Sequence, residues 1–324
     1  MTTRPLGPFN VHPIGLGCMN LNHAYGKPPS PEVARDLLLK ALDLGVTLFD
    51  TAALYGFGAN ESLIGPVLKP YRDRITLCSK GGMAGVNFPD GLKRVVNGRP
   101  EAIRLNCEDS LRRLGTDVID LYYLHRRDFK VPIEDSVGEL SRLVEEGKVQ
   151  TIGLSEVSAD TIRKAHKVHP IAAVQNEFSL LYRDLAEETL KTTRELGISF
   201  VAYAPIGRGL LSQEIADPAT LAEGDTRKRQ PRYSKDNLDH NKALVQRVQD
   251  IAKQKHCTVA QLAIAWVLAQ GDDVIPIPGT KQKARLLENL GALNVRLTPA
   301  DIAAISSAVP ANAVKGTRYP EAQM

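Results

Sequence analysis

The chain reads Gly-Val-Thr-Leu-Phe-Asp-Thr-Ala-Ala-Leu-Tyr from Gly45 to Tyr55. Its first part, residues 46–49, is a short and mostly apolar run behind a glycine, which is typical of a buried parallel strand. Asp50 places a carboxylate where this strand ends, and Tyr55 follows in the next loop. The stretch therefore predicts a strand that delivers two polar side chains to one edge of a sheet.

Two later apolar runs end in the same way. Residues 75–79 lead to Lys80, and residues 118–124 lead to His125. Taken singly, a polar residue after a strand is most often a cap, a turn former or a satisfied core residue. In a parallel barrel, however, the carboxyl ends of all strands meet at one mouth, where the catalytic groups of such barrels lie. The joint pattern therefore predicts one site.

Short apolar strands and amphipathic helices alternate along the whole chain. Counting from Ile14, we expect eight strands, at residues 14–18, 46–50, 74–79, 118–124, 149–154, 171–175, 198–203 and 274–277. A first helix should begin at Ser30 and end at Gly45, and further helices are expected near 60–69, 100–114, 134–146, 158–168, 185–196, 238–255, 258–270, 281–292 and 299–308. Eight such units predict the α/β class and a closed (β/α)8 TIM barrel, rather than an open sheet. No composition shift marks a second domain, so we expect one domain over residues 1–324.

Four segments lie outside this alternation. Residues 4–12 have turn residues between apolar ones and predict a small hairpin, placed to plug the barrel floor. Residues 206–237 are too long for an ordinary connection and predict a functional flap. Residues 83–96 are expected to be irregular, and the tail from 311 to 324 is expected to border the site.

Composition limits the classes of function. The chain has 43% hydrophobic and 24% charged residues, which rules out wholesale disorder. Its net charge is only +4. The densest basic cluster consists of Arg227, Lys228, Arg229 and Arg232. We interpret this cluster as a solvated loop rather than a nucleic-acid site, because no aromatic platform or recognition helix accompanies it.

The chain carries four cysteines without any C-x-x-C pair, which fits a reducing compartment and argues against a zinc ribbon. His12, His23 and His125 lack metal-ligand spacing, so no metal is expected. No apolar signal core opens the chain, and no stretch approaches ~18 consecutive apolar residues. We therefore expect a cytoplasmic protein without a membrane partner.

The four polar residues at the predicted mouth suggest acid catalysis. A phenol is a poor acid because its ordinary pKa is about 10. The ammonium of Lys80 would favour the phenolate of Tyr55, and Asp50 would keep a buried Lys80 charged. His125 can donate a hydrogen bond to a substrate carbonyl. Such a site protonates an oxygen as negative charge develops on it, which carbonyl reduction requires.

At these residues the chain resembles the aldo-keto reductases. The segment 49–56, with Asn60-Glu61 and Gly65 beyond it, is similar to the family's signature around its aspartate and tyrosine. Ser79-Lys80 and the segment 121–125 resemble the lysine and histidine segments in order and spacing. The resemblance covers essentially the whole chain. It implies that Tyr55 is the general acid, that Lys80 and Asp50 tune it, and that His125 positions the carbonyl.

Carbonyl reduction also needs a hydride, which only a nicotinamide cofactor can supply here. A Rossmann fingerprint is absent, because residues 15–20 lack the third glycine. The family resemblance implies instead an extended dinucleotide across the carboxyl-terminal face of the barrel. By that resemblance Ser155, Glu156 and Gln175 would contact the carboxamide, although many relatives carry asparagine in place of Glu156.

Two further segments match the family's cofactor contacts. Tyr203 would stack on the nicotinamide ring, unless it only packs in the core. The following backbone would approach the pyrophosphate at Pro205, Gly207, Arg208, Gly209 and Leu210. A helix start after strand eight would bind the adenosine half through Gly279, Thr280, Lys281, Gln282, Arg285, Glu288 and Asn289. Lys281 and Arg285, one turn apart, predict a 2′-phosphate site and hence NADPH, unless they form only a solvated helix start.

The substrate is less defined than the chemistry. Met19, Tyr25, Phe88, Phe129 and Tyr319 are candidates for an apolar pocket, or each packs within its own loop. Pyridoxal, aromatic aldehydes, sugar-derived aldehydes and polycyclic ketones all remain open as substrates. We expect a monomer because no apolar stripe marks an interface. An alternative function is that of a nucleotide-sensing regulatory subunit, since the family also includes channel-associated β subunits.

Overall fold

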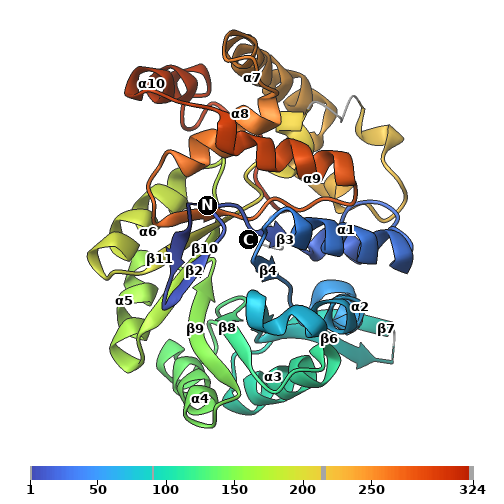
Figure 1. The fold of residues 1–324 in the computed structure, drawn as a ribbon, viewed down its shortest axis with the longest axis vertical. Coiled ribbons are helices and arrows are strands. Elements are labelled where there is room, and N and C mark those ends of the chain that lie inside the picture. Colours follow the sequence, from blue (N-terminus) through green and yellow to red (C-terminus); the bar gives the residue numbers. More distant parts are fainter. Residues whose placement is uncertain (1, 90, 213–216, 321–324) are drawn as a thin grey trace.

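The computed structural model describes residues 2–89, 91–212 and 217–320. Its main sheet has eight parallel strands in the order β12-β11-β10-β9-β8-β5-β4-β3 (Figure 1). The strands are β3 (Leu16–Gly17), β4 (Leu48–Asp50), β5 (Thr76–Gly81), β8 (Ile119–Leu124), β9 (Val149–Ser155), β10 (Ile171–Glu177), β11 (Ser199–Tyr203) and β12 (Val274–Pro276). The two ends of the sheet meet where Gly15 N donates to Pro276 O at 3.0 Å and Gly17 bridges to Gly279. The predicted eight-stranded (β/α)8 barrel is therefore confirmed.

Ten helices accompany these strands in the described part of the chain. They are α1 (Pro31–Asp43), α2 (Ala59–Leu68), α3 (Pro100–Leu114), α4 (Ile133–Glu145), α5 (Ala159–Val168), α6 (Asp184–Glu195), α7 (Lys235–Gln254), α8 (Val259–Leu268), α9 (Lys283–Leu290) and α10 (Pro299–Ala308). Most of them form the outer ring around the strands in Figure 1. Apolar side chains fill the layer between strands and helices, because most helices bury an apolar stripe against the sheet, while α7 and α10 pack against each other outside it.

The predicted N-terminal hairpin is present. Strands β1 (Arg4–Leu6) and β2 (Phe9–Val11) pair antiparallel. Leu6 and Val11 are fully buried against side chains of the barrel interior, among them Leu121 and Ile275. Ser199, at the start of β11, bonds to Pro5 O at 3.0 Å, so the hairpin covers the amino ends of the strands. It leaves the opposite mouth open for chemistry.

The expectation of an irregular segment over residues 83–96 is wrong. Strands β6 (Met83–Phe88) and β7 (Gly91–Val96) form an antiparallel hairpin that projects from the barrel (Figure 1). Most of its side chains are at least partly exposed, so the segment lacks the alternation of apolar and polar residues that identifies a half-buried strand. The Asp-Gly pair at 90–91 is a hairpin signal that the sequence did contain.

The segment 206–237 folds into short 3-10 turns, namely η4 (Gly207–Ser212), η5 (Pro218–Thr220), η6 (Thr226–Arg229) and η7 (Pro231–Tyr233), while residues 213–216 lie outside the described residues. The interpretation of its basic cluster as a solvated loop is wrong for two arginines. Arg227 pairs with Asp225 at 2.7 Å, and Arg232 lies 3.8 Å from the buried Glu177. Of the four basic residues in this cluster, Lys228 and Arg229 are the exposed ones. We call residues 206–237 the flap.

Candidate active site

The four residues that the sequence predicted to act together lie side by side, three of them joined by hydrogen bonds and His125 through a ring contact. Lys80 Nζ donates to Asp50 Oδ1 at 2.5 Å, to the backbone oxygen of Thr51 at 2.8 Å and to the Tyr55 hydroxyl at 3.2 Å. His125 follows β8 directly, and its ring lies edge-on to that of Tyr55 with centroids 5.8 Å apart. All four side chains are buried, so their charges act in a medium of low dielectric constant.

The start of α2 holds the loop that carries Tyr55. Asn60 accepts a hydrogen bond from Thr51 Oγ1 at 2.6 Å, and its own amide donates to Cys18 O at 2.9 Å. Glu61 accepts from Ser79 Oγ at 2.5 Å and pairs with Arg113 at 2.7 Å. These buried polar residues therefore tie the loop to strands β3 and β5 on either side of β4.

Burial and a cation act in opposite directions on the phenol of Tyr55. Burial is the larger effect, and the pKa of Tyr55 is raised above 10 even though Lys80 acts to lower it. The expected net lowering by Lys80 is therefore not found. Burial also acts against the charge of Lys80, yet Asp50 raises the pKa of this lysine above its ordinary value. Near neutral pH the group consists of a protonated phenol beside an ammonium.

His125 is neutral near pH 7. Burial lowers its pKa well below 6.5, and the charges of Lys80 and Arg126 lower it further. Its Nδ1 has no hydrogen-bond partner among the described residues. A neutral imidazole can donate one hydrogen bond to a ligand oxygen without competing with Tyr55 as an acid.

The predicted pocket residues separate into two groups. Met19 packs against the apolar cluster that contains Tyr55 and Met83. Tyr25 lies instead beside the flap, with the guanidinium of Arg227 4.9 Å from its ring centroid. Phe88 and Phe129 are 44% and 84% exposed, and each ring contacts a cation of its own loop. Of these four, only Met19 lies against the group around Tyr55, and Tyr319, the fifth candidate, lies against Tyr203 instead.

The residues predicted at the ends of β9 and β10 face the mouth but already have protein partners. Ser155 Oγ accepts a hydrogen bond from Arg126 at 3.3 Å. Gln175 Nε2 donates to Asp50 Oδ2 at 2.8 Å, which joins it to the group around Lys80. Glu156 has a left-handed backbone, with φ of 53°, and pairs with Arg318 at 2.8 Å.

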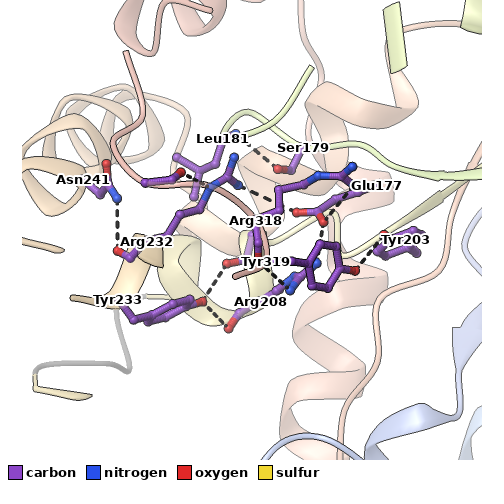
Figure 2. A network of polar contacts seen from close by, with 12 residues as sticks. Glu177, Ser179, Leu181, Tyr203, Arg208, Arg232, Tyr233, Asn241, Arg318 and Tyr319 are labelled. Carbon is purple, nitrogen blue, oxygen red and sulfur yellow. Dashed lines mark hydrogen bonds and ion pairs between the residues drawn. The ribbon is translucent and has the colours of Figure 1, made fainter. Parts of the chain in front are cut away.

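A network of arginines and tyrosines surrounds Glu177 (Figure 2). Glu177, at the end of β10, pairs with Arg208 at 2.6 Å and lies 3.5 Å from Arg318. The Tyr203 and Tyr319 hydroxyls are 3.2 Å apart, and Arg208 lies 4.5 Å from the Tyr319 ring centroid. The tail expected to border the site therefore lies against the end of β11.

Sequence reasoning missed Glu177 and Arg318. Glu177 follows Gln175 by two positions. Because alternate residues of a strand share a face, the sequence could have predicted that the two side chains point the same way. Arg318 had no such signal, because it belongs to an irregular tail whose position only the folded chain defines.

The turn after β11 has an unusual backbone. Gly207, Arg208 and Gly209 all have positive φ, at 57°, 56° and 99°. The Tyr233 hydroxyl donates towards the backbone oxygens of Gly207 and Arg208, at 3.2 and 3.0 Å. Pro205 precedes this turn, and Leu210 is buried behind it. The turn is thus fixed by the flap itself.

The helix start after β12 contains several cations. Lys281 Nζ donates to the backbone oxygens of Tyr25 and Lys27, at 2.7 and 3.0 Å. No carboxylate lies within ion-pair distance of Lys281 in the part of the chain that is described. Arg285 pairs with Glu288 at 2.5 Å.

The other residues predicted in this segment lie close by. Gly279 approaches the backbone of Gly17, and the Thr280 hydroxyl accepts a hydrogen bond from Gln282 N at 3.1 Å. Asn289 is buried. Glu288 lines a surface cavity of about 290 Å³ together with Leu211 and Ser212 of the flap.

The flap contacts the loop that follows β3. Thr226 N donates to Ala24 O at 3.0 Å, and Arg227 stacks on Tyr25 as described above. Two segments that are far apart in the sequence therefore meet on the side of the mouth where Lys281 lies. No group of three or more His, Cys, Asp or Glu side chains suited to a metal ion occurs in residues 2–89, 91–212 and 217–320. Within the same ranges, no helix is long and apolar enough to span a membrane.

Comparisons with known proteins match this geometry. The model of the Aldo/keto reductase family matches residues 13–310. A "Probable aldo-keto reductase 1" of Glycine max is 47% identical over 312 residues, which are 96% of this chain and 89% of that protein. A glycerol dehydrogenase structure from Gluconobacter oxydans superposes with a TM-score of 0.84 at 28% identity and 94% coverage of both chains. An aldo-keto reductase structure from Bacillus halodurans, in its holo form, superposes with a TM-score of 0.75 at 28% identity and 100% coverage of both chains.

Proposed function

The chain belongs to the aldo/keto reductase family, and from this membership we propose that it is an NADPH-dependent oxidoreductase that reduces aldehydes or ketones. In this proposal Tyr55 donates the proton to the carbonyl oxygen. The observation that carries the assignment is the Tyr55 hydroxyl 3.2 Å from Lys80 Nζ, inside a buried group that also contains Asp50 and His125.

The pKa values support this division of roles. Tyr55 holds its proton near neutral pH because its pKa is raised, so the phenol is ready to donate. The ammonium of Lys80 stabilises the phenolate that remains after the transfer, because it is already in place and needs no reorganisation. Asp50 keeps Lys80 charged. The N–H of neutral His125 directs the carbonyl oxygen towards Tyr55.

A bound nicotinamide dinucleotide would supply the hydride that no side chain can provide. The residues at the mouth fit such a group. The Ser155 hydroxyl retains a proton to donate, and the ring of Tyr203 is partly exposed at the end of β11. The phosphates would pass along the start of the flap, beside the backbone of Pro205, Gly207, Arg208, Gly209 and Leu210. Gln175 would contact the carboxamide while its amide also bonds to Asp50. Glu156 would contact the carboxamide while its carboxylate stays paired with Arg318.

The phosphate preference rests on the helix start after β12. Among the described residues, Lys281 Nζ has backbone oxygens as its only hydrogen-bond partners, so its charge is available to an anion. Arg285 lies one turn further along, and Gly279, Thr280 and Gln282 bring backbone amides to the same end of α9. Glu288, beside the cavity, and Asn289 would contact the adenine. We therefore propose NADPH as the preferred cofactor.

Replacing Tyr55 with phenylalanine tests the activity. The proposal predicts that Tyr55→Phe loses about 100- to 10,000-fold in kcat, because proton donation by a positioned acid contributes that much. Binding of NADPH, followed by the quenching of protein fluorescence, should persist. Tyr71→Phe, at a partly exposed tyrosine of the segment 69–74, is the matched control and should leave both quantities unchanged. Undiminished reduction by Tyr55→Phe would refute the assignment.

We also propose a monomeric protein of the cytoplasm. The four cysteines, all unpaired and three of them buried, support the location. Light scattering of the purified protein would test the oligomeric state, and fractionation of the source cells would test the location.

A further inference from the structure

Arg126 stands next to His125 but has no role in the chemistry proposed above. Its Nη1 donates to the backbone oxygen of His125 at 2.9 Å and to Ser155 Oγ at 3.3 Å. The two bonds hold the guanidinium between the end of β8 and the end of β9. The side chain is partly exposed, so it faces the mouth rather than the core.

No carboxylate pairs with Arg126 among the described residues. Acids at the neighbouring strand ends already have partners, because Asp50 pairs with Lys80 and Glu156 pairs with Arg318. Glu177 lies among Arg208, Arg232 and Arg318. Glu156 acts on the charge of Arg126 only from beyond ion-pair distance. A guanidinium that is partly removed from water and makes no direct ion pair would gain from a ligand that brings a negative charge into contact with it.

A second arginine acts electrostatically on the histidines beside Tyr55. Arg94, on the exposed hairpin strand β7, carries no ion pair in the described ranges. Its charge contributes, after burial, to lowering the pKa of His23, whose ring stacks on Tyr55 with centroids 6.0 Å apart. It also acts to lower the pKa of His125, where it is the last of five causes, after burial, Lys80, Arg126 and His23. Arg94 and Arg126 therefore both add positive charge near the histidines that flank Tyr55.

We propose that Arg126 is a specificity residue that binds an anionic group of the substrate, so that the preferred carbonyl compounds also carry a carboxylate or a phosphate monoester. The inference rests on the proposed function, since it concerns the substrate of the same site. Arg126 lies beside His125, and a carbonyl oxygen at Tyr55 and His125 would leave the rest of the molecule within reach of the guanidinium. A planar guanidinium can bind either anion through two parallel hydrogen bonds.

Matched substrate pairs test the proposal. 4-Carboxybenzaldehyde is compared with its methyl ester, and glyceraldehyde 3-phosphate with glyceraldehyde, each with NADPH as the reductant. We expect the wild-type protein to prefer at least one anionic member by about ten- to hundredfold in kcat/KM, mainly through KM. The pair that shows the preference identifies the anion.

The variant Arg126→Met should abolish this preference by raising KM for the anionic member, while kcat/KM for the neutral member and the binding of NADPH stay the same. Arg127→Met is the matched control, because Arg127 bonds to Thr161 Oγ1 at 2.7 Å and makes no contact with Ser155. It should keep the preference. Thermal unfolding verifies that both variants fold.

The outcomes separate the two proposals. Equal kcat/KM within both pairs for the wild-type protein would overturn the role of Arg126 while leaving carbonyl reduction intact. An equal loss on anionic and neutral substrates in Arg126→Met would also overturn it, since that pattern would indicate a structural or cofactor role. Failure of the wild-type protein to reduce even the neutral aldehydes would instead contradict the proposed function.

Discussion

Lys80 and Asp50 form an ion pair of 2.5 Å inside the barrel, with side chains that are only 1% and 4% exposed. Removing one partner of such a pair leaves the other charge buried without compensation. We expect Lys80→Met to lower kcat by about 100-fold or more, because the phenolate of Tyr55 would form without a neighbouring cation. Stopped-flow measurement of NADPH oxidation checks this, and a kcat within threefold of wild type would contradict it.

The pH dependence of reduction should be flat across the neutral range. The pKa of Tyr55 is raised above 10 and that of His125 lies well below 6.5. Tyr55 therefore keeps its proton, and His125 stays neutral, between these two values. The rate should fall only as alkaline pH deprotonates Tyr55. A profile of kcat/KM for a neutral aldehyde measures this, and a decline centred near pH 7 would contradict it.

The cations at the start of α9 should decide the cofactor. Replacing both Lys281 and Arg285 with alanine removes charge from the proposed 2′-phosphate site, so we expect at least tenfold weaker NADPH binding and little change for NADH. Lys283→Ala is the control, because Lys283 pairs with Asp36 on the surface. Calorimetric titration with both dinucleotides measures the difference. Unchanged NADPH affinity in the double variant would show that the phosphate binds elsewhere.

Glu177 should be important for stability, because it is buried among three arginines. Glu177→Gln leaves these cations without their shared counter-ion, and we expect a loss of about 3–5 kcal/mol in the free energy of unfolding. Glu187→Gln is the control, since Glu187 is 60% exposed and lies 4.0 Å from Arg183. Urea unfolding measures both variants.

The effect of Glu177 should also depend on pH. Burial acts to raise its pKa, but Arg208, Arg318 and Arg232 together hold the pKa below 4.5. A lowered pKa gives stability that is complete above the pKa of the unfolded chain and is lost as pH falls through the folded value. The difference between wild type and Glu177→Gln should therefore narrow below about pH 4.5. A constant difference down to acid unfolding would contradict the pairing.

Gly65 tests the packing that supports the loop of Tyr55. A Cβ atom there would lie 2.6 Å from the backbone of Leu114 in α3, so Gly65→Ala should destabilise the protein by about 1–3 kcal/mol. Gly138 in α4 has open space around it, and Gly138→Ala should stabilise the protein by about 0.5–1 kcal/mol. Thermal unfolding of the two variants should give shifts of opposite sign.

Local patterns in the sequence were enough to predict the barrel and the four residues at its mouth. Apolar runs and helix signals depend on neighbours within a few positions, and parallel strands bring their carboxyl ends together. Asp50, Tyr55, Lys80 and His125 could therefore be placed together from their positions after strands. The hairpin β6–β7 was missed because its exposed strands bury no regular face.

Contacts between distant segments required the folded chain. Which loops meet above the barrel decides the pairing of Glu177 with Arg208 and Arg318 and the position of Tyr319 against Tyr203. It also decides that Arg126 bonds to His125 and Ser155 and to no carboxylate among the described residues. The net direction of the Tyr55 pKa likewise depends on how deeply the phenol is buried, and a sequence records the neighbouring charge but not the loss of water. The order of polar residues after successive strands therefore indicated the kind of chemistry. Tertiary packing determined the balance between burial and charge at the mouth.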